Sequence, residues 1–395
     1  MAEQTYAHLL QQVDQAEVVD LCSELIRFKS VNPPGNEREI AEYVARVMHD
    51  AGLETELVSH APDRASVAGR LKGSGKVPGL LYTGHLDVVP LGEAPWSFDA
   101  FAGKVEGGRI LGRGASDMKA GDAAMIVAAK MLAAAKVPLK GDLILGFTAG
   151  EETDFLGAHA IANGWHLGPV QGIFISEPTD NEVTVAEKGL MWLEIATHGK
   201  TAHISQIQHG RNAIMMMLPI LTALDKMPVA YQENKLLGGY VRSINTIHAG
   251  LKTNTIPDHC VAQVDMRTVP GQDHDAILQQ IQELIDDVGK SCGLPDFRAS
   301  LKVIHNGPPL ETASNDPMLV RFLDVVAEVT GKRPAVKGAG YGTDGKAFVP
   351  KLKAPYVICG PGNPTQNHQT DEWADVAKMV ESVKIYLLTA TRFLA

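Results

Sequence analysis

The sequence predicts an α/β fold that is interrupted by a smaller inserted α+β domain. The chain has 395 residues, which is more than one hydrophobic core usually serves. Continuous apolar runs, typical of strands buried on both faces, alternate with helical segments in the first and last parts of the chain. In the middle part, apolar and polar residues alternate as they do in half-exposed strands.

Two helices are predicted to open the chain, and buried strands follow them. Residues 15–28 and 37–51 place apolar side chains at helical spacing, with the breaker sequence Asn-Pro-Pro-Gly between them. The apolar runs that we interpret as strands lie at 79–83, 142–148, 172–175 and 354–359. A helix is predicted at 118–136, between the first two of these strands. Strands separated by helices predict an α/β sheet.

The middle of the chain predicts a separate domain. Segments 189–197 and 261–267 have the alternation of half-exposed strands, and 276–292 has the pattern of a long helix. The predicted domains are 1–186 together with 303–395 for the α/β part, and 187–302 for the insertion.

The composition argues against several classes of protein. Apolar residues make up 45% of the chain and charged residues 21%, as in ordinary globular proteins. The net charge of -10 argues against nucleic acid or an anionic membrane as the main partner. The polar, acidic N-terminus lacks the pattern of a secretory signal, and no apolar run reaches the roughly 18 residues that span a bilayer. We therefore expect a cytoplasmic protein without a membrane anchor.

Side chains that can bind metal ions follow the predicted strands. They are His85, Asp117, Glu151, Glu152, Glu177 and His368. Each of them alone is more often a helix cap or a turn former. Together they fall at the carboxyl edge of the predicted sheet, where open α/β sheets bind ligands. Imidazoles and carboxylates suit a borderline cation such as zinc, with cobalt or manganese as alternatives.

Five motifs carry a resemblance to a known family. They are GHLDVVP at 84–90, GRGASDMKAG at 112–121, TAGEET at 148–153, SEPT at 176–179 and NHQTDEW at 367–373. In this order they resemble the co-catalytic zinc metallopeptidase family of acetylornithine deacetylase, succinyl-diaminopimelate desuccinylase, aminoacylase and glutamate carboxypeptidase. The resemblance runs essentially from end to end. It implies a three-layer, zinc-peptidase-like catalytic domain and a ferredoxin-like insertion that serves as lid and dimerisation domain.

The resemblance also implies two divalent metal ions per chain. His85 and Glu177 would bind the first ion, Glu152 and His368 would bind the second, and Asp117 would bridge both. A shared carboxylate offsets part of the repulsion between two dications.

Two further acidic residues are assigned by the resemblance. Glu151 would be the general base, which takes a proton from the water shared by the metals and returns it to the leaving amine. Asp87 would support His85, because in an extended segment positions 85 and 87 lie on the same side and the Asp87 carboxylate can accept the free ring N–H. The alternatives are a loop cap for Asp87 and a solvated helix start for the paired glutamates.

Three residues of the insertion resemble family positions that reach the active site. His203 would stabilise an oxyanion, Arg267 would bind the carboxylate of the substrate, and Asn254 would assist by hydrogen bonding. The histidine often comes from the partner subunit, so a homodimer through the inserted domain is expected. A surface role is the alternative for each residue. Ile204 stands where the family usually has a small residue.

The resemblance predicts hydrolysis of the amide bond of a small N-acyl amino acid, of the deacetylase or desuccinylase type. Family members with glutamate at the position of Glu177 are typically deacylases or carboxypeptidases, whereas aminopeptidases and dipeptidases usually carry aspartate. A carboxypeptidase or dipeptidase acting on peptide substrates is one alternative, and hydrolysis of an unusual C–N bond is another. A catalytically silent binding protein would be expected to lack Glu151 or a ligand, and none is missing.

Overall fold

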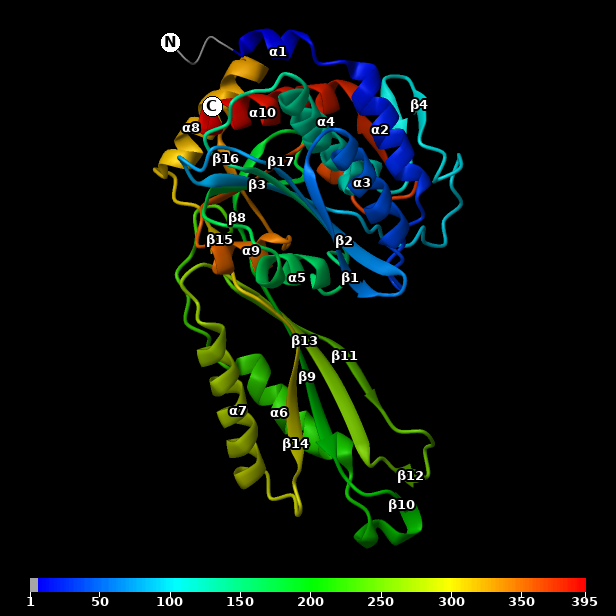
Figure 1. Cartoon of the computed structure of the whole chain (residues 1–395). Helices are drawn as coiled ribbons and strands as arrows, with labels where there is room; N and C mark the ends of the chain where they lie inside the picture. The colour runs from blue at the N-terminus through cyan, green and yellow to red at the C-terminus, as the bar shows by residue number, and fades with distance from the viewer. Residues whose placement is uncertain (1–5) are drawn as a thin grey trace. The chain divides into compact units, whose positions relative to one another are not determined.

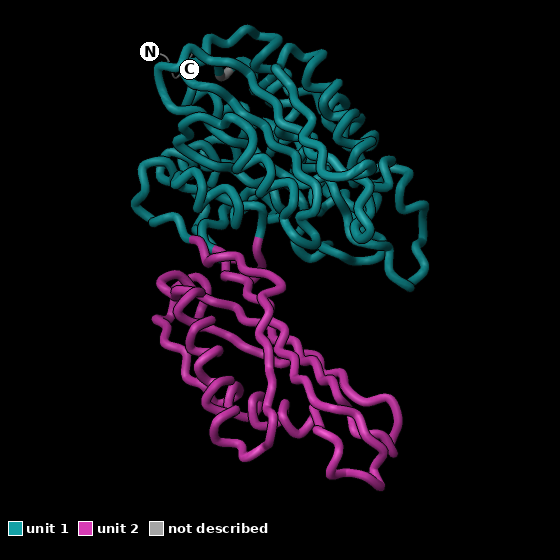
Figure 2. The backbone as a smooth tube through the Cα atoms, turned by 60° about the horizontal axis from the view of Figure 1, so that its bottom comes forward, with its two compact units in different colours: residues 1–186, 311–338, 343–395 teal, residues 187–310, 339–342 magenta. Residues whose placement is uncertain are grey.

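The computed structural model describes residues 6–395 and divides them into two compact units (Figure 2). Unit 1 comprises the chain up to Ala186 with Glu311–Gly338 and Thr343–Ala395, and unit 2 comprises Glu187–Leu310 and Ala339–Gly342. The predicted boundary between 302 and 303 is wrong, because it falls inside a strand that stays paired up to Gly307. The short return of 339–342 to unit 2 was not predicted.

Unit 1 contains most of the helices and strands. Its helices are α1 (Ala7–Gln11), α2 (Gln15–Arg27), α3 (Arg38–Asp50), the π-helical turn η1 (Ala115–Lys119), α4 (Ala120–Ala134), α5 (Leu156–Gly164), α8 (Pro317–Thr330), α9 (Gly345–Leu352), η3 (Pro364–Gln366) and α10 (Val376–Leu394). Its strands are β1 (Glu54–Ala61), β2 (Arg64–Leu71), β3 (Gly79–His85), β4 (Lys104–Glu106), β5 (Arg109–Leu111), β6 (Leu143–Thr148), β7 (Val170–Pro178), β8 (Val183–Glu187), β15 (Leu310–Glu311), β16 (Val336–Ala339), β17 (Tyr356–Gly360) and β18 (Trp373–Asp375).

A large mixed sheet forms the centre of unit 1. Its strand order is β1-β2-β6-β3-β7-β17-β8-β15, and β16 pairs with β8. The four middle strands β6, β3, β7 and β17 are parallel. Helices α2, α4 and α10 pack on one another over one face, and α5 and α9 lie together on the other (Figure 1). This arrangement confirms the predicted three-layer α/β fold. Strands β3 and β6 are buried along their whole length, as their continuous apolarity predicted.

Aromatic packing fixes two of the strands that lead to the candidate site. Tyr82 of β3 pairs in register with Phe174 of β7, and their rings meet edge to face with centroids 5.6 Å apart. The Tyr82 hydroxyl donates a hydrogen bond to the carbonyl oxygen of Tyr386 in α10, at 2.7 Å. Each of the paired aromatic residues precedes a predicted metal ligand, His85 or Glu177, by three positions. Rigid packing therefore lies directly behind both ligands.

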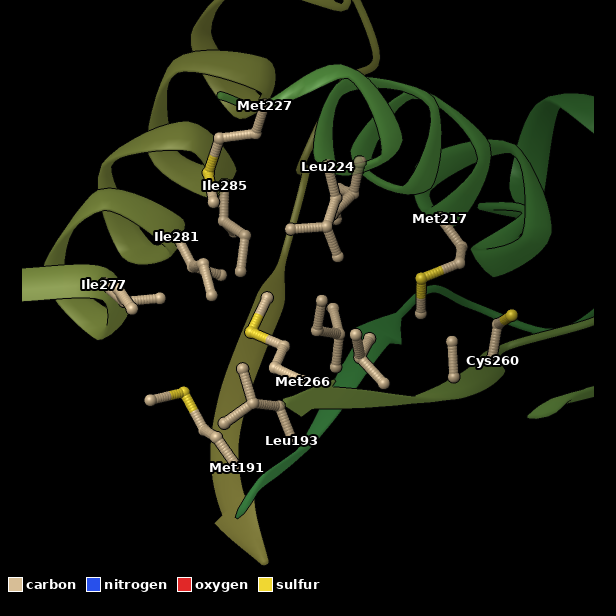
Figure 3. Packing of buried hydrophobic residues seen from close by; sticks show 14 of the residues in the cluster. Met191, Leu193, Met217, Leu224, Met227, Cys260, Met266, Ile277, Ile281 and Ile285 are labelled. Carbon is tan, nitrogen blue, oxygen red and sulfur yellow. The ribbon is translucent and has the colours of Figure 1, made fainter. Parts of the chain in front are cut away.

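Unit 2 is a four-stranded antiparallel sheet with two helices on one face. Its elements are β9 (Gly189–His198), β10 (Ala202–His203), η2 (Ile204–His209), α6 (Ala213–Lys226), β11 (Val241–Ala249), β12 (Thr255–Ile256), β13 (His259–Thr268), α7 (His274–Ser291) and β14 (Ala299–Gly307). The sheet order is β11-β13-β9-β14. Leu193 and Met266 of the sheet pack against Met217 of α6 and Ile281 of α7 (Figure 3). The order of strands and helices confirms the predicted ferredoxin-like α+β insertion.

No helix among the described residues 6–395 is both long and apolar enough to cross a membrane.

Candidate metal centre

The candidate centre lies at the carboxyl edge of the parallel strands in unit 1. Strand β3 ends at His85, β6 ends three residues before Glu151, and β7 carries Glu177 near its end. His85 pairs with Thr148 and Gly360 pairs with Pro178, so the register brings these strand ends to one edge. Parallel strands place their carboxyl ends together, and this topology gathers residues that are far apart in the sequence.

Asp117 lies between the two predicted histidine ligands. Its Oδ1 is 3.0 Å from His85 Nε2, and its Oδ2 is 3.6 Å from His368 Nε2. Glu177 Oε1 is 3.8 Å from His85 Nε2, and Glu152 Oε2 is 3.1 Å from His368 Nε2. The five predicted ligands thus form two groups that have Asp117 in common.

The donor atoms of the centre converge closely enough for cations. One ligand atom each from His85, Asp117 and Glu152 lie within 4.8 Å of one another, and the same holds for His85, Glu151 and Glu177. All of these side chains are buried or partly buried. Nitrogen and oxygen donors without a thiolate suit zinc, cobalt or manganese.

The charges of the centre also fit divalent cations. Burial raises the pKa of Glu151 well above its usual value, and the charge of Glu177 raises it further. Burial likewise raises the pKa of Glu177, with the charge of Asp117 adding to the effect. For His85, burial alone would lower the pKa, but the hydrogen bond to Asp117 and the charge of Glu177 hold it well above the usual value. Cations among these donors would offset the repulsion between the carboxylates.

The expectation for the Asp87 carboxylate is wrong in its detail. The ring nitrogen Nδ1 of His85 donates to the main-chain carbonyl of Asp87 at 2.9 Å, whereas the nearer carboxylate oxygen lies 3.8 Å away. Strand β3 ends at His85, so the extended geometry that would place both side chains on one side stops there. Because a carbonyl only accepts, Nδ1 carries the proton and Nε2 is left for a metal.

The Asp87 carboxylate instead holds the turn that carries the two glutamates. It accepts backbone N–H groups from Gly150 at 3.0 Å, Glu151 at 3.2 Å and Glu152 at 3.1 Å. Asn32 donates to the same carboxylate at 2.8 Å. Sequence reasoning assigned Asn32 only to a breaker loop, and its neighbouring prolines gave no sign of this contact.

The predicted residues of unit 2 have different surroundings. His203 is exposed at the end of β10, and its Nδ1 lies 2.8 Å from Ser205 Oγ. The carbonyl of Asn254 accepts the N–H of Ile204 at 3.1 Å, so Asn254 lies next to the His203 segment. Arg267, near the end of β13, donates through Nε to Asp265 Oδ1 and through Nη2 to Asp265 Oδ2, each at 2.9 Å. Its guanidinium is therefore already paired along one edge.

Comparison with known proteins places this geometry in context. The profile of peptidase family M20/M25/M40 matches residues 81–392. A probable succinyl-diaminopimelate desuccinylase of Staphylococcus epidermidis is 25% identical, covering 95% of this chain and 97% of that protein. An N-formyl-4-amino-5-aminomethyl-2-methylpyrimidine deformylase of Bacillus subtilis is 26% identical, covering 94% of this chain and 93% of that protein.

Solved structures share the fold. An M20 family metallo-carboxypeptidase from Sulfolobus solfataricus matches with a TM-score of 0.79 and 19% identity, covering 95% of this chain and 99% of that chain. The aminopeptidase PepT from Bacillus cereus matches with a TM-score of 0.75 and 21% identity, covering 96% of this chain and 99% of that chain.

Proposed function

Because the chain belongs to peptidase family M20/M25/M40, we propose that it is a hydrolase that uses two divalent cations to cleave the amide bond of an N-acyl amino acid. The observation that carries this proposal is the position of Asp117, whose two carboxylate oxygens face the imidazoles of His85 and His368. A carboxylate placed in this way can serve two cations at once, and a shared anion lowers their mutual repulsion.

We assign the donors to two cations that share Asp117. His85 and Glu177 would complete one site, and Glu152 and His368 the other. When bound, the cations would supply Lewis acidity to the scissile carbonyl and to the attacking water. Zinc suits these nitrogen and oxygen donors, and cobalt or manganese would also fit.

Glu151 is our candidate for the general base. One of its carboxylate oxygens lies within 4.8 Å of ligand atoms of His85 and Glu177. The carboxylate would take a proton from the attacking water and deliver it to the nitrogen of the leaving amine. The Asp87 carboxylate accepts the backbone N–H of Glu151 and keeps this residue in place.

The relatives favour an N-acyl substrate. The desuccinylase and the deformylase are named for the removal of a succinyl or formyl group, and Arg267 offers a cation for a substrate carboxylate. Asp265 occupies the Nε side of that guanidinium, and Nη1 makes only a long hydrogen bond of 3.5 Å to the carbonyl of Gly340, which a substrate carboxylate would replace. Succinylated and formylated amino acids are therefore the first substrates to test, and dipeptides follow.

The geometry of unit 2 supports a homodimer. His203 pairs with Thr255 beside the start of β13, whereas Arg267 lies eight residues along β13 from His259. Eight residues of strand span about 26 Å at about 3.3 Å per residue. One small substrate cannot touch both side chains of one chain, so we infer that His203 serves the centre of a second copy. Exposed apolar side chains on α6 and β11, among them Met215 and Val241, offer an interface.

Mixing two inactive variants tests the shared site. His203→Ala and Glu151→Ala would each lack activity, but a mixed dimer would contain one centre with both residues intact. In a symmetric dimer, equal mixing would restore about a quarter of the wild-type activity. An inactive mixture whose subunits have exchanged, as judged by a tag on one variant, would contradict the proposal for His203.

The function itself is tested with a substrate panel. N-succinyl, N-formyl and N-acetyl amino acids and dipeptides would be assayed before and after chelation. We expect chelator-sensitive release of an amine from an N-acyl amino acid, restored by zinc. Faster turnover of dipeptides would assign the chain to the peptidase alternative, and turnover that chelation leaves unchanged would contradict the metal mechanism.

A further inference from the structure

A buried ion pair lies beside the metal centre and has no part in the chemistry described above. Arg113 and Glu372 have side chains only 2% and 0% exposed, and Arg113 Nη1 donates to Glu372 Oε2 at 2.7 Å. Burying two charges costs desolvation energy, which good geometry and further hydrogen bonds must offset. The further partners of this pair therefore indicate where it acts.

The Glu372 carboxylate holds the segment that carries Asp117. Its Oε1 accepts the backbone N–H groups of Ser116 at 2.7 Å and of Asp117 itself at 3.0 Å. Its Oε2 accepts the N–H of Gly114 at 2.9 Å as well as Arg113. Gly114 has a φ of 82°, and a Cβ there would come within 2.5 Å of Val88, so only glycine fits this tight wrapping. The carboxylate thus fixes the backbone from which the shared ligand projects.

Arg113 extends the network to the two histidine loops. Its Nη1 also donates to the carbonyl of Gln369, next to His368, at 3.1 Å. Its Nη2 donates to the carbonyl of Pro90, in the loop after His85, at 3.3 Å. The ion pair therefore touches all three loops that carry His85, Asp117 and His368.

The loop of His368 needs support from outside. His368 has a φ of 61°, a left-handed conformation that is unfavourable for a residue with a Cβ. Its side chain is 54% exposed, so packing holds it weakly. The hydrogen bond from Arg113 to the adjacent carbonyl is a restraint that acts on the backbone of this loop.

We propose that Arg113 and Glu372 are positioning residues. Glu372 fixes the backbone of Asp117 and thereby sets the affinity for both cations, and Arg113 fixes the loop of His368 and thereby sets mainly the affinity for the cation of Glu152 and His368. The proposal rests on the metal ligands assigned above. The two residues act unequally, because Glu372 contacts the backbone of the shared ligand and Arg113 contacts the loop of His368. Loss of Glu372 would weaken the binding of both cations. Loss of the Arg113 guanidinium would weaken mainly the binding of the cation at Glu152 and His368.

Two variants of the full chain test this unequal action. In Arg113→Lys the charge is kept, but a single ammonium cannot reach Glu372, Gln369 and Pro90 together. In Glu372→Gln an amide N–H₂ faces N–H donors. Zinc titrated calorimetrically into the metal-free proteins should bind Arg113→Lys with one affinity unchanged and the other at least about tenfold weaker, the size typical of residues that orient ligands. Glu372→Gln should weaken both affinities.

A more exposed ion pair, remote from the site, serves as a control that separates positioning from stability. Arg70 and Asp142 form an ion pair at the amino ends of the strands, with Arg70 Nε 3.4 Å from Asp142 Oδ2, at the edge of the sheet remote from the site. Asp142→Asn should lower the Tm of the metal-free protein and leave both zinc affinities unchanged. If Arg113→Lys likewise lowers the Tm and leaves both zinc affinities unchanged, the pair of Arg113 and Glu372 is merely structural and the inference is wrong.

The remaining outcomes are equally decisive. If Glu372→Gln does not fold, the two zinc affinities of Arg113→Lys alone test the inference. A wild-type chain that binds two zinc ions but hydrolyses no amide leaves the inference standing and removes the proposed function. A wild-type chain that binds no zinc removes both.

Discussion

The candidate residues of unit 1 and of unit 2 have similar chemistry but very different surroundings. In unit 1, imidazoles and carboxylates from four strand ends and their loops converge, with His85 Nε2 3.0 Å from Asp117 Oδ1 and His368 Nε2 3.1 Å from Glu152 Oε2. In unit 2, His203 is exposed in the two-stranded sheet of β10 and β12, and Arg267, near the end of β13 in the four-stranded sheet, is paired with Asp265. The five proposed metal ligands of unit 1 all come from one chain, whereas the residues of unit 2 need a substrate or a second copy to give them a role.

The topology of the two sheets explains the difference. Parallel strands bring all their carboxyl ends to one edge of the sheet, so residues that directly follow such strands lie close together. Antiparallel strands send successive loops to opposite ends, and β13 alone separates His259 from Arg267 by most of its length. Function in unit 1 is therefore more firmly implied by the fold than function in unit 2.

The largest effect is expected from Glu151→Gln, which tests the centre of unit 1. Loss of the general base should lower kcat by about 10² to 10⁴-fold, while the metal content stays at the wild-type level because the five ligands remain. Steady-state kinetics and elemental analysis check this. A kcat near the wild-type value would assign the proton transfer to another group.

Asp87→Asn should have a smaller effect, of about 10 to 100-fold in kcat. The amide would turn an N–H₂ group toward the backbone N–H groups of Gly150, Glu151 and Glu152, so the turn that holds the base would loosen. His85 keeps its hydrogen bond to the main-chain carbonyl of residue 87, and its metal should bind as before. If zinc affinity falls while kcat at saturating zinc is unchanged, Asp87 acts through His85 and the observed hydrogen bonds do not define its role.

The smallest effect is expected from Arg267→Lys in unit 2. Losing a charge-assisted hydrogen bond of about 1.5 to 3 kcal/mol would raise KM by about tenfold or more for substrates with a free carboxylate. Substrates in which that carboxylate is esterified should show little change, and they serve as the control. An equal change for both substrates would mean that Arg267 is not the carboxylate site.

The parts of the fold that were predictable are those with strong local patterns. Strands β3 and β6 have unbroken apolar runs, and the sequence placed them within two residues. The hairpin of β1 and β2 was missed, because β1 is largely exposed and its apolar positions are few. The position of Asp117 followed from a motif, but the ion pair that supports it joins residues 259 positions apart. Neither Arg113 nor Glu372 has a local pattern that points to the other.

Metal analysis of the purified chain decides whether the centre of unit 1 holds two divalent cations. We expect about two ions per chain in the wild type after reconstitution with zinc, and clear loss of metal in Asp117→Asn, the shared ligand. His203→Ala in unit 2 should retain both ions. Wild-type protein that hydrolyses its substrate while binding no metal would show that the centre of unit 1 is not a metal centre.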